Sequence, residues 1–123
     1  MNSLQQSPDC RPPVDDPPIT VSLAKTAAAG LEVRTSTGEV WAIPWPHFVG
    51  ARFYGEPDGE RIVLSFTEHE ITLKGLRLGP LLKEIAGCRI EFLAPLPPNY
   101  RFQPRNKSPE IRRVLVELLP DSP

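Results

Sequence analysis

Residues 31–43 of this chain read LEVRTSTGEVWAI, and they carry the clearest structural prediction in the sequence. Leu31 and Val33 alternate with charged residues, which is the period of two typical of a half-buried strand. Residues 36–38 (STG) then form a turn, in which glycine can adopt a positive φ. Residues 40–43 return in an extended, apolar pattern. The stretch therefore predicts a β-hairpin, and it indicates that the chain folds around β-sheet.

The same alternation on both sides of the hairpin predicts further strands. It recurs in residues 19–24, 47–54, 61–67, 71–73 and 88–92. In the second of these segments the pattern predicts Val49 and Phe53 on one face and Phe48 and Arg52 on the other. In the third it points Ile62 toward the core.

Two connections between these strands follow from turn chemistry. Residues 57–59 read PDG, and each of these residues favours a turn for its own reason. Glu68 and His69 predict a second tight turn, with one long strand running through them as the alternative.

Two segments have helical spacing. Residues 78–86 predict a short helix, with Pro80 in its first turn and Gly87 as its C-cap. Residues 108–119 begin with Ser-Pro-Glu, which is typical of a helix start, and predict a C-terminal helix. A final strand is the alternative there, because Val114 and Val116 are β-branched.

The predicted fold class is α+β: a small, curved, mainly antiparallel sheet of five to seven strands with one short helix packed on it. The segment at residues 108–119 would add a second helix to this fold. Proline occurs 16 times in 123 residues. Its crowding predicts a disordered, proline-rich tail at residues 1–18 and a proline-rich basic loop at 94–108. Residues 19–119 are expected to form one domain, with residues 120–123 as a short tail.

Charge and composition argue against a membrane protein and a secreted protein, and they predict a cytoplasmic protein. The formal net charge is −1, which gives no general affinity for nucleic acid or for a membrane surface. No run approaches the ~20 apolar residues of a membrane helix, and no signal-peptide pattern precedes residue 18. Cys10 and Cys88 form no disulfide framework, so a reduced setting is expected.

The sequence carries no catalytic motif that we recognise. Glu68, His69 and Glu70 cannot converge on one metal ion in a strand, because alternate side chains point to opposite faces. Cys88 matches no nucleophile signature, and the glycines form no phosphate-binding loop. We therefore expect a protein that is not an enzyme and that has no cofactor and no metal.

The stretch Trp41 to Phe48 holds the first group of candidate binding residues, Trp45 and His47. Trp45 lies between two prolines, so its backbone is stiff, and a rigid aromatic side chain suits a partner-binding surface. The alternative is that Trp41 and Trp45 cap the small core.

The second group interleaves aromatic and basic residues in the way that single-stranded nucleic acid can be held. Its members are Tyr100, Arg101, Phe102, Arg105 and Lys107, and Arg112 and Arg113 extend the same patch. The alternative is a solvated loop whose two aromatic rings pack against the sheet.

From these observations the sequence predicts a non-catalytic protein–protein interaction module, of the kind of a small bacterial accessory or adaptor protein. Self-association is expected, because a short chain gains stability by burying surface in an oligomer. A nucleic-acid-binding accessory protein that uses residues 100–113 is the alternative hypothesis. No membrane partner is expected.

Overall fold

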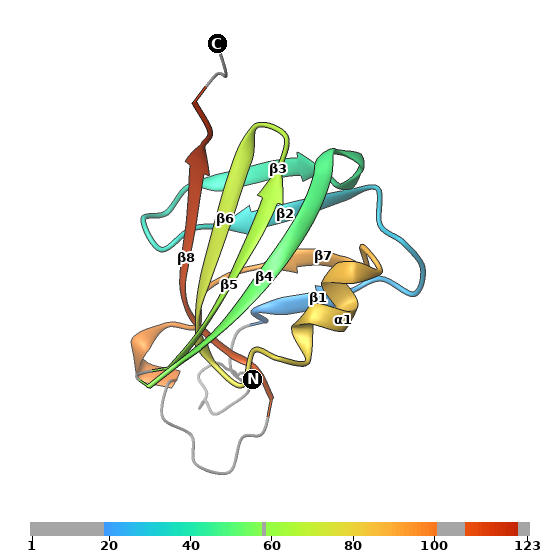
Figure 1. The fold of residues 1–123 in the computed structure, drawn as a ribbon. Coiled ribbons are helices and arrows are strands. Elements are labelled where there is room, and N and C mark those ends of the chain that lie inside the picture. The colour runs from blue at the N-terminus through green and yellow to red at the C-terminus, as the bar shows by residue number, and fades with distance from the viewer. Residues whose placement is uncertain (1–18, 58, 101–107, 121–123) are drawn as a thin grey trace, which may run out of the picture.

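The structure, a computed structural model, describes residues 19–57, 59–100 and 108–120. The predicted tail at residues 1–18 lies outside these ranges. Within them the chain forms eight strands, one α-helix and two short 3₁₀ helices, as Figure 1 shows.

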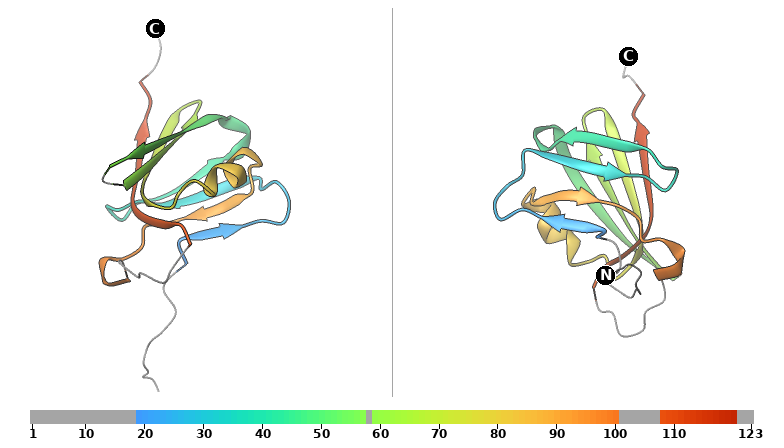
Figure 2. Two further views of the ribbon diagram at one scale, coloured as in Figure 1. Left: turned by 60° about the horizontal axis from the view of Figure 1, so that its bottom comes forward. Right: turned by 180° about the vertical axis from the view of Figure 1, so that it is seen from behind.

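The strands form two four-stranded sheets. The first sheet has the order β1 (Val21–Leu23), β7 (Ile90–Leu93), β2 (Gly30–Arg34) and β3 (Val40–Pro44). The second sheet has the order β4 (Phe48–Glu56), β5 (Gly59–Phe66), β6 (His69–Leu76) and β8 (Glu110–Leu118). Of the paired neighbours, β2 and β7 run parallel and the others run antiparallel. The two sheets face each other with their strands crossing at a steep angle (Figures 1 and 2), which is an orthogonal β-sandwich arrangement.

The helix α1 (Leu81–Ala86) lies at the side of the sandwich, between β4 and the pair β1 and β7 (Figure 2). Its buried residues, Leu81 and Ile85, face the core. The chain leaves the helix through Gly87 and through Cys88, whose φ is 55°. The helix predicted over residues 78–86 is therefore present and begins three residues later than expected.

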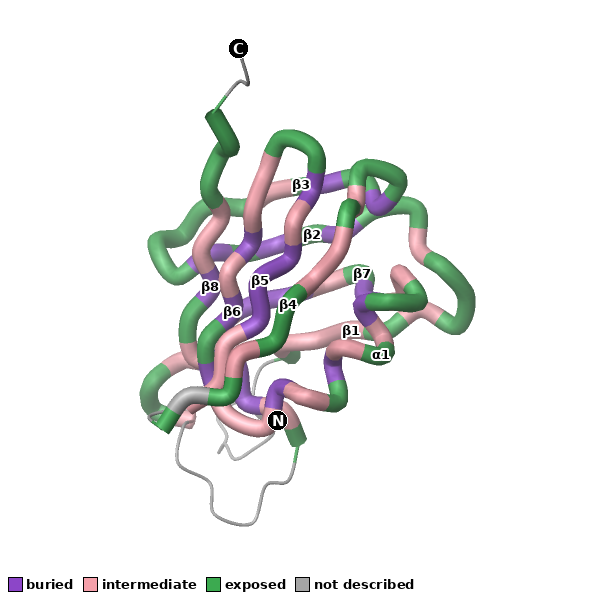
Figure 3. Tube along the Cα trace, in the orientation of Figure 1, coloured by how far each residue is buried: buried purple, intermediate pink, exposed green. Residues whose placement is uncertain are grey.

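The core lies between the sheets, and both sheets contribute buried residues to it (Figure 3). Alternate residues of β5 point inward as the sequence predicts, since Ile62, Leu64 and Phe66 are each at most 1 % exposed. Burying an aliphatic or phenyl side chain of this size contributes about 1.5–3 kcal/mol. Other members of the same cluster are Leu31, Val33, Ile43, Ile71, Leu73, Leu78, Ile85, Leu93, Ile111 and Val114.

The hairpin predicted at residues 31–43 is confirmed. It is formed by β2 and β3, in which Leu31 pairs with Ile43 and Val33 pairs with Trp41. Gly38 in its turn has a φ of 94°, as the turn requires. The coarse prediction of a mostly β domain with one short helix also holds. The described residues, however, hold eight strands in two sheets instead of five to seven in one, because η2 (Trp45–His47) turns the chain from β3 into the second sheet.

The predicted helix at residues 108–119 is wrong, because this segment forms the strand β8. It pairs with β6 over eight positions, which satisfies one edge of β6. A bulge explains the misleading helical spacing: Lys74 pairs with Arg113, whereas Gly75 pairs with Ile111. The extra residue puts Ile111 and Val114 on the same inward face, although they are three residues apart.

A second bulge corrects the predicted faces of β4. Phe48 pairs with Phe66 and Gly50 pairs with Ser65, so Val49 is the extra residue. Phe48 therefore points into the core, where its ring lies 5.4 Å from that of Phe66. Val49 is 70 % exposed instead. A turn separates β5 from β6, as predicted, and one long strand does not run through. The turn lies at Thr67 and Glu68, one residue earlier than predicted, because β5 ends at Phe66 and β6 begins at His69.

Candidate functional site

Trp45, the first candidate binding residue, is buried. It is 3 % exposed, and its indole Nε1 donates a hydrogen bond to the Ile90 carbonyl oxygen at 2.7 Å. Its ring meets Phe48 edge-on at 5.1 Å. The structure thus places Trp45 in the core and not on a partner-binding surface, because η2 turns the side chain inward where the chain passes between the sheets.

The other predicted site residues are scattered or lie outside the described residues. His47 is exposed, and its carbonyl oxygen accepts a hydrogen bond from the Thr67 backbone N–H at 2.9 Å. Tyr100 is half-buried at the end of η3 (Pro98–Tyr100). The remaining four, Arg101, Phe102, Arg105 and Lys107, lie outside the ranges that the structure describes.

The histidines and Cys88 sit on separate elements. His69, at the start of β6, packs edge-on against the Trp41 ring with 5.3 Å between ring centroids. Cys88 is half-buried beyond α1. Within the described ranges, no group of three or more His, Cys, Asp or Glu side chains is placed to hold a metal ion.

One buried carboxylate has a structural role. Glu110 is 2 % exposed at the start of β8. One of its oxygens bonds to the Arg112 Nε, and the other lies 3.7 Å from the Arg77 Nη2. Both oxygens are therefore paired, and the carboxylate joins β8 to the end of β6.

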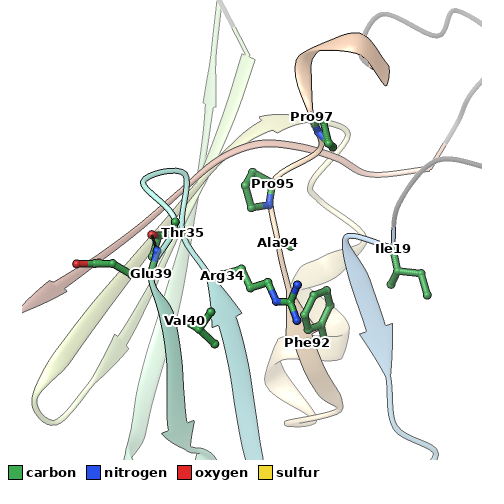
Figure 4. Close-up of a pocket in the computed structure, with 10 residues that line it drawn as sticks. Ile19, Arg34, Thr35, Glu39, Val40, Phe92, Ala94, Pro95 and Pro97 are labelled. Carbon is green, nitrogen blue, oxygen red and sulfur yellow. Dashed lines mark hydrogen bonds between the residues drawn. The ribbon is translucent and has the colours of Figure 1, made fainter.

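A shallow pocket of about 380 Å³ opens on the first sheet where β2 and β7 diverge (Figure 4). Its central feature is the Arg34 guanidinium, which lies 5.3 Å from the centre of the Phe92 ring. The Arg34 Nε also lies 3.2 Å from a carboxylate oxygen of Glu32. Since the cation is already paired with both a ring and a carboxylate, it offers a ligand little unmet attraction.

The outer face of the second sheet carries a line of basic residues that runs across the strands. Tyr54 pairs with Arg61, Arg61 with Lys74, and Lys74 with Arg113. Residues that pair directly in an antiparallel sheet point to the same face, and adjacent strands lie about 4.8 Å apart. We call these four residues the basic row. Arg52, two residues before Tyr54, adds a further cation to the same face.

The basic row places like charges opposite each other. Lys74 and Arg113 are exposed, and neither pairs with a carboxylate of the described residues. Arg61 is half-buried, and its guanidinium lies 4.2 Å from the centre of the Tyr54 ring. Like charges directly opposite in a sheet are destabilising. Lys74 and Arg113 therefore place two exposed cations side by side on a protein whose formal net charge is −1.

Along the strands of this face, the charge of successive rows changes from positive to negative. The next outward row, Arg52, Val63, Thr72 and Leu115, is largely uncharged, and Val63 within it is 8 % exposed. The row after that contains Glu70, which pairs with Glu117. Basic and acidic residues thus lie at opposite ends of this face.

The open edges of the two sheets differ in how well they are protected. β1 has three residues, and β3 has five and ends at Pro44. β8 is capped where Leu96 donates to the Ile111 carbonyl and where Ser36 bonds to Val114. The edge strand β4 is nine residues long, and no other strand of the described chain pairs with its outer side, although the helix α1 contacts part of β4. We call this side the β4 edge.

Comparison with known proteins places the chain in no group: no family model, no curated protein and no solved structure matches it. In the part of the chain that the structure describes, no helix has the length and apolar character needed to cross a membrane.

Sequence reasoning missed both the basic row and the β4 edge. The residues of the row stand at positions 54, 61, 74 and 113, so no local pattern connects them. The alternation in β5 and β6 does predict that Arg61 and Lys74 point outward. The strand order and the register alone bring them into one line.

Proposed function

We propose that this protein is a non-catalytic interaction module that associates with a second copy of itself along the β4 edge. The observation that carries the proposal is the contrast between β4 and the other three edge strands. The others are short, end in proline or are capped, whereas β4 offers nine residues. The cytoplasmic setting and the bacterial accessory or adaptor role belong to the same proposal.

The backbone supports this proposal. In an antiparallel pair, every second residue directs its N–H and C=O away from its partner. Apart from the Phe48 N–H, which donates to the Trp45 carbonyl oxygen, those groups of β4 have no hydrogen-bond partner on another element of the described residues. A second copy of β4, running antiparallel across a two-fold axis, would satisfy them and would extend the sheet from four to eight strands.

The side chains at the β4 edge also favour association. Val49 is 70 % exposed and Phe53 is 38 % exposed, although both are large and apolar. A long edge strand with exposed apolar side chains is a known template for pairing between chains. Joining two such edges would remove both side chains from water, with a gain of about 25 cal/mol for each Å² buried.

The test is the solution mass of the full chain by light scattering over a range of concentrations. We expect a species of twice the 13.7 kDa monomer mass. Val49→Lys should raise the dissociation constant by about tenfold or more, because an unpaired ammonium group in a joined edge costs over ~1.4 kcal/mol.

The matched control is Val40→Lys, which puts the same charge on the edge strand β3 at a valine that is 62 % exposed. It should leave the dissociation constant within about twofold, because surface substitutions usually have small effects. The proposal would be refuted if the wild-type chain stayed monomeric at every concentration up to ~1 mM, because its dissociation constant would then be above ~1 mM. Equal effects of the two substitutions would show that another surface joins the copies.

A further inference from the structure

We propose that the basic row is a binding site for the phosphate backbone of single-stranded nucleic acid. The proposal does not depend on the β4 edge or on self-association. It rests on Tyr54, Arg61, Lys74 and Arg113, which three consecutive strand registers bring into one line.

The first argument is electrostatic. Lys74 and Arg113 repel one another when the row is empty, because they lie directly opposite each other on neighbouring strands. A series of phosphate groups along the row would replace this repulsion by attraction. The exposed Lys74 and Arg113 can reach phosphate oxygens without leaving a carboxylate partner among the described residues.

The second argument concerns the kind of anion. Tyr54 ends the row with an aromatic ring, and the adjacent row provides the half-buried apolar side chain of Leu115. Proteins that bind single strands combine cations for the backbone with aromatic and apolar surface for the bases. An acidic peptide needs the cations but not the ring, so this composition favours nucleic acid.

The third argument concerns direction. Glu70 and Glu117 occupy the same face two rows away from the cations. A strand of nucleic acid that ran parallel to the β-strands would bring its phosphates to these carboxylates. We therefore infer that it runs across the strands, from Arg113 toward Tyr54.

The test is fluorescence anisotropy of the full chain with labelled DNA and RNA oligonucleotides of about 12 nucleotides, within the usual site size of such proteins. We expect binding at ~50 mM salt that weakens as salt rises. The double variant Lys74→Glu and Arg113→Glu should weaken binding by about tenfold or more. It should also reduce the slope of log K against log salt by about two, one for each lost phosphate contact.

The matched control is Lys83→Glu, which changes an exposed lysine on α1, away from the row. It should change the affinity by less than about twofold, since it removes no phosphate contact. Circular dichroism and thermal melting of each variant show that the fold is intact, and Lys74→Arg should retain binding because it keeps the charge.

Three results would overturn the proposal. The first is no binding of the wild-type chain to either oligonucleotide at low salt. The second is an equal loss of affinity in Lys83→Glu, which would indicate a general charge effect. The third is competition by polyglutamate that matches competition by unlabelled oligonucleotide, which would assign the row to acidic peptides instead.

Discussion

Ser36 hydrogen-bonds to both backbone groups of Val114, although 78 residues separate the two in the chain. The Ser36 backbone N–H donates to the Val114 carbonyl oxygen at 3.0 Å, and the Val114 N–H donates to the Ser36 Oγ at 2.9 Å. The turn of the β2–β3 hairpin thus takes the place that a further strand would occupy beside β8. This contact joins the two sheets, and it protects an edge that would otherwise be open.

Ser36→Ala should destabilise the fold by about 1 kcal/mol, because it removes the acceptor of one of these two hydrogen bonds. The Val114 N–H would be left without its partner at a buried residue. Urea unfolding measures the effect. Ser65→Ala on the second sheet, whose side chain makes no hydrogen bond in the described structure, should change stability by less than about 0.5 kcal/mol. Equal stability of the two variants would show that the Ser36 contact contributes nothing.

Trp45→Phe should destabilise the fold by about 1–3 kcal/mol, because the buried Ile90 carbonyl would lose the indole N–H that donates to it. Trp41→Phe is the matched substitution. Trp41 is half-buried, and its N–H donates to the exposed Glu39 carboxylate at 3.2 Å, which water can replace. Its cost should therefore be clearly smaller in the same urea titration. The reverse order would contradict the burial of Trp45.

Gly75→Ala should destabilise the fold by about 3 kcal/mol or more, because the backbone itself would have to move. A Cβ on Gly75 would lie 1.9 Å from the Glu110 carbonyl oxygen and 3.1 Å from the Ile111 Cα, at the bulge between β6 and β8. Gly79→Ala is the control, because a Cβ there meets no atom within 4 Å. Thermal unfolding should separate the two variants by well over ~5 °C. Similar melting temperatures would show that β8 is not packed at this register.

The predictions that succeeded from sequence were local ones. Alternation predicted that Leu31 and Val33 point inward, and both are buried. Gly38 marked the hairpin turn, and Pro80 and Gly87 bracketed the helix. Each of these signals depends on residues close together in the chain, where backbone geometry and side-chain direction are linked directly.

The predictions that failed were ones in which an irregularity changed the phase of a strand. One extra residue at Val49 turned Phe48 into the core. One extra residue in β8 gave Ile111 and Val114 the spacing of a helix. Periodicity cannot show a bulge, because its cause is the register with a neighbouring strand that is distant in the chain.

The candidate sites depend on long-range pairing in the same way. Trp45 looked suited to a partner because its flanking prolines are visible in the sequence, whereas its hydrogen bond to Ile90 is not. The basic row was hidden because its four residues become neighbours only through the pairing of β4, β5, β6 and β8.

The sequence by itself determined where most strands lie, which side chains the regular strands β2 and β5 bury, and where α1 forms, because these properties follow from local periodicity and turn chemistry. The tertiary structure alone decided that the strands divide into two crossed sheets, that residues 110–118 pair with β6, and that no strand pairs with the outer side of β4. The tertiary structure also decided that Arg61, Lys74 and Arg113 become neighbours on the outer face of the second sheet. The physical reason is that strand pairing is set by the burial of a shared core, and every residue of that core contributes to the choice of register.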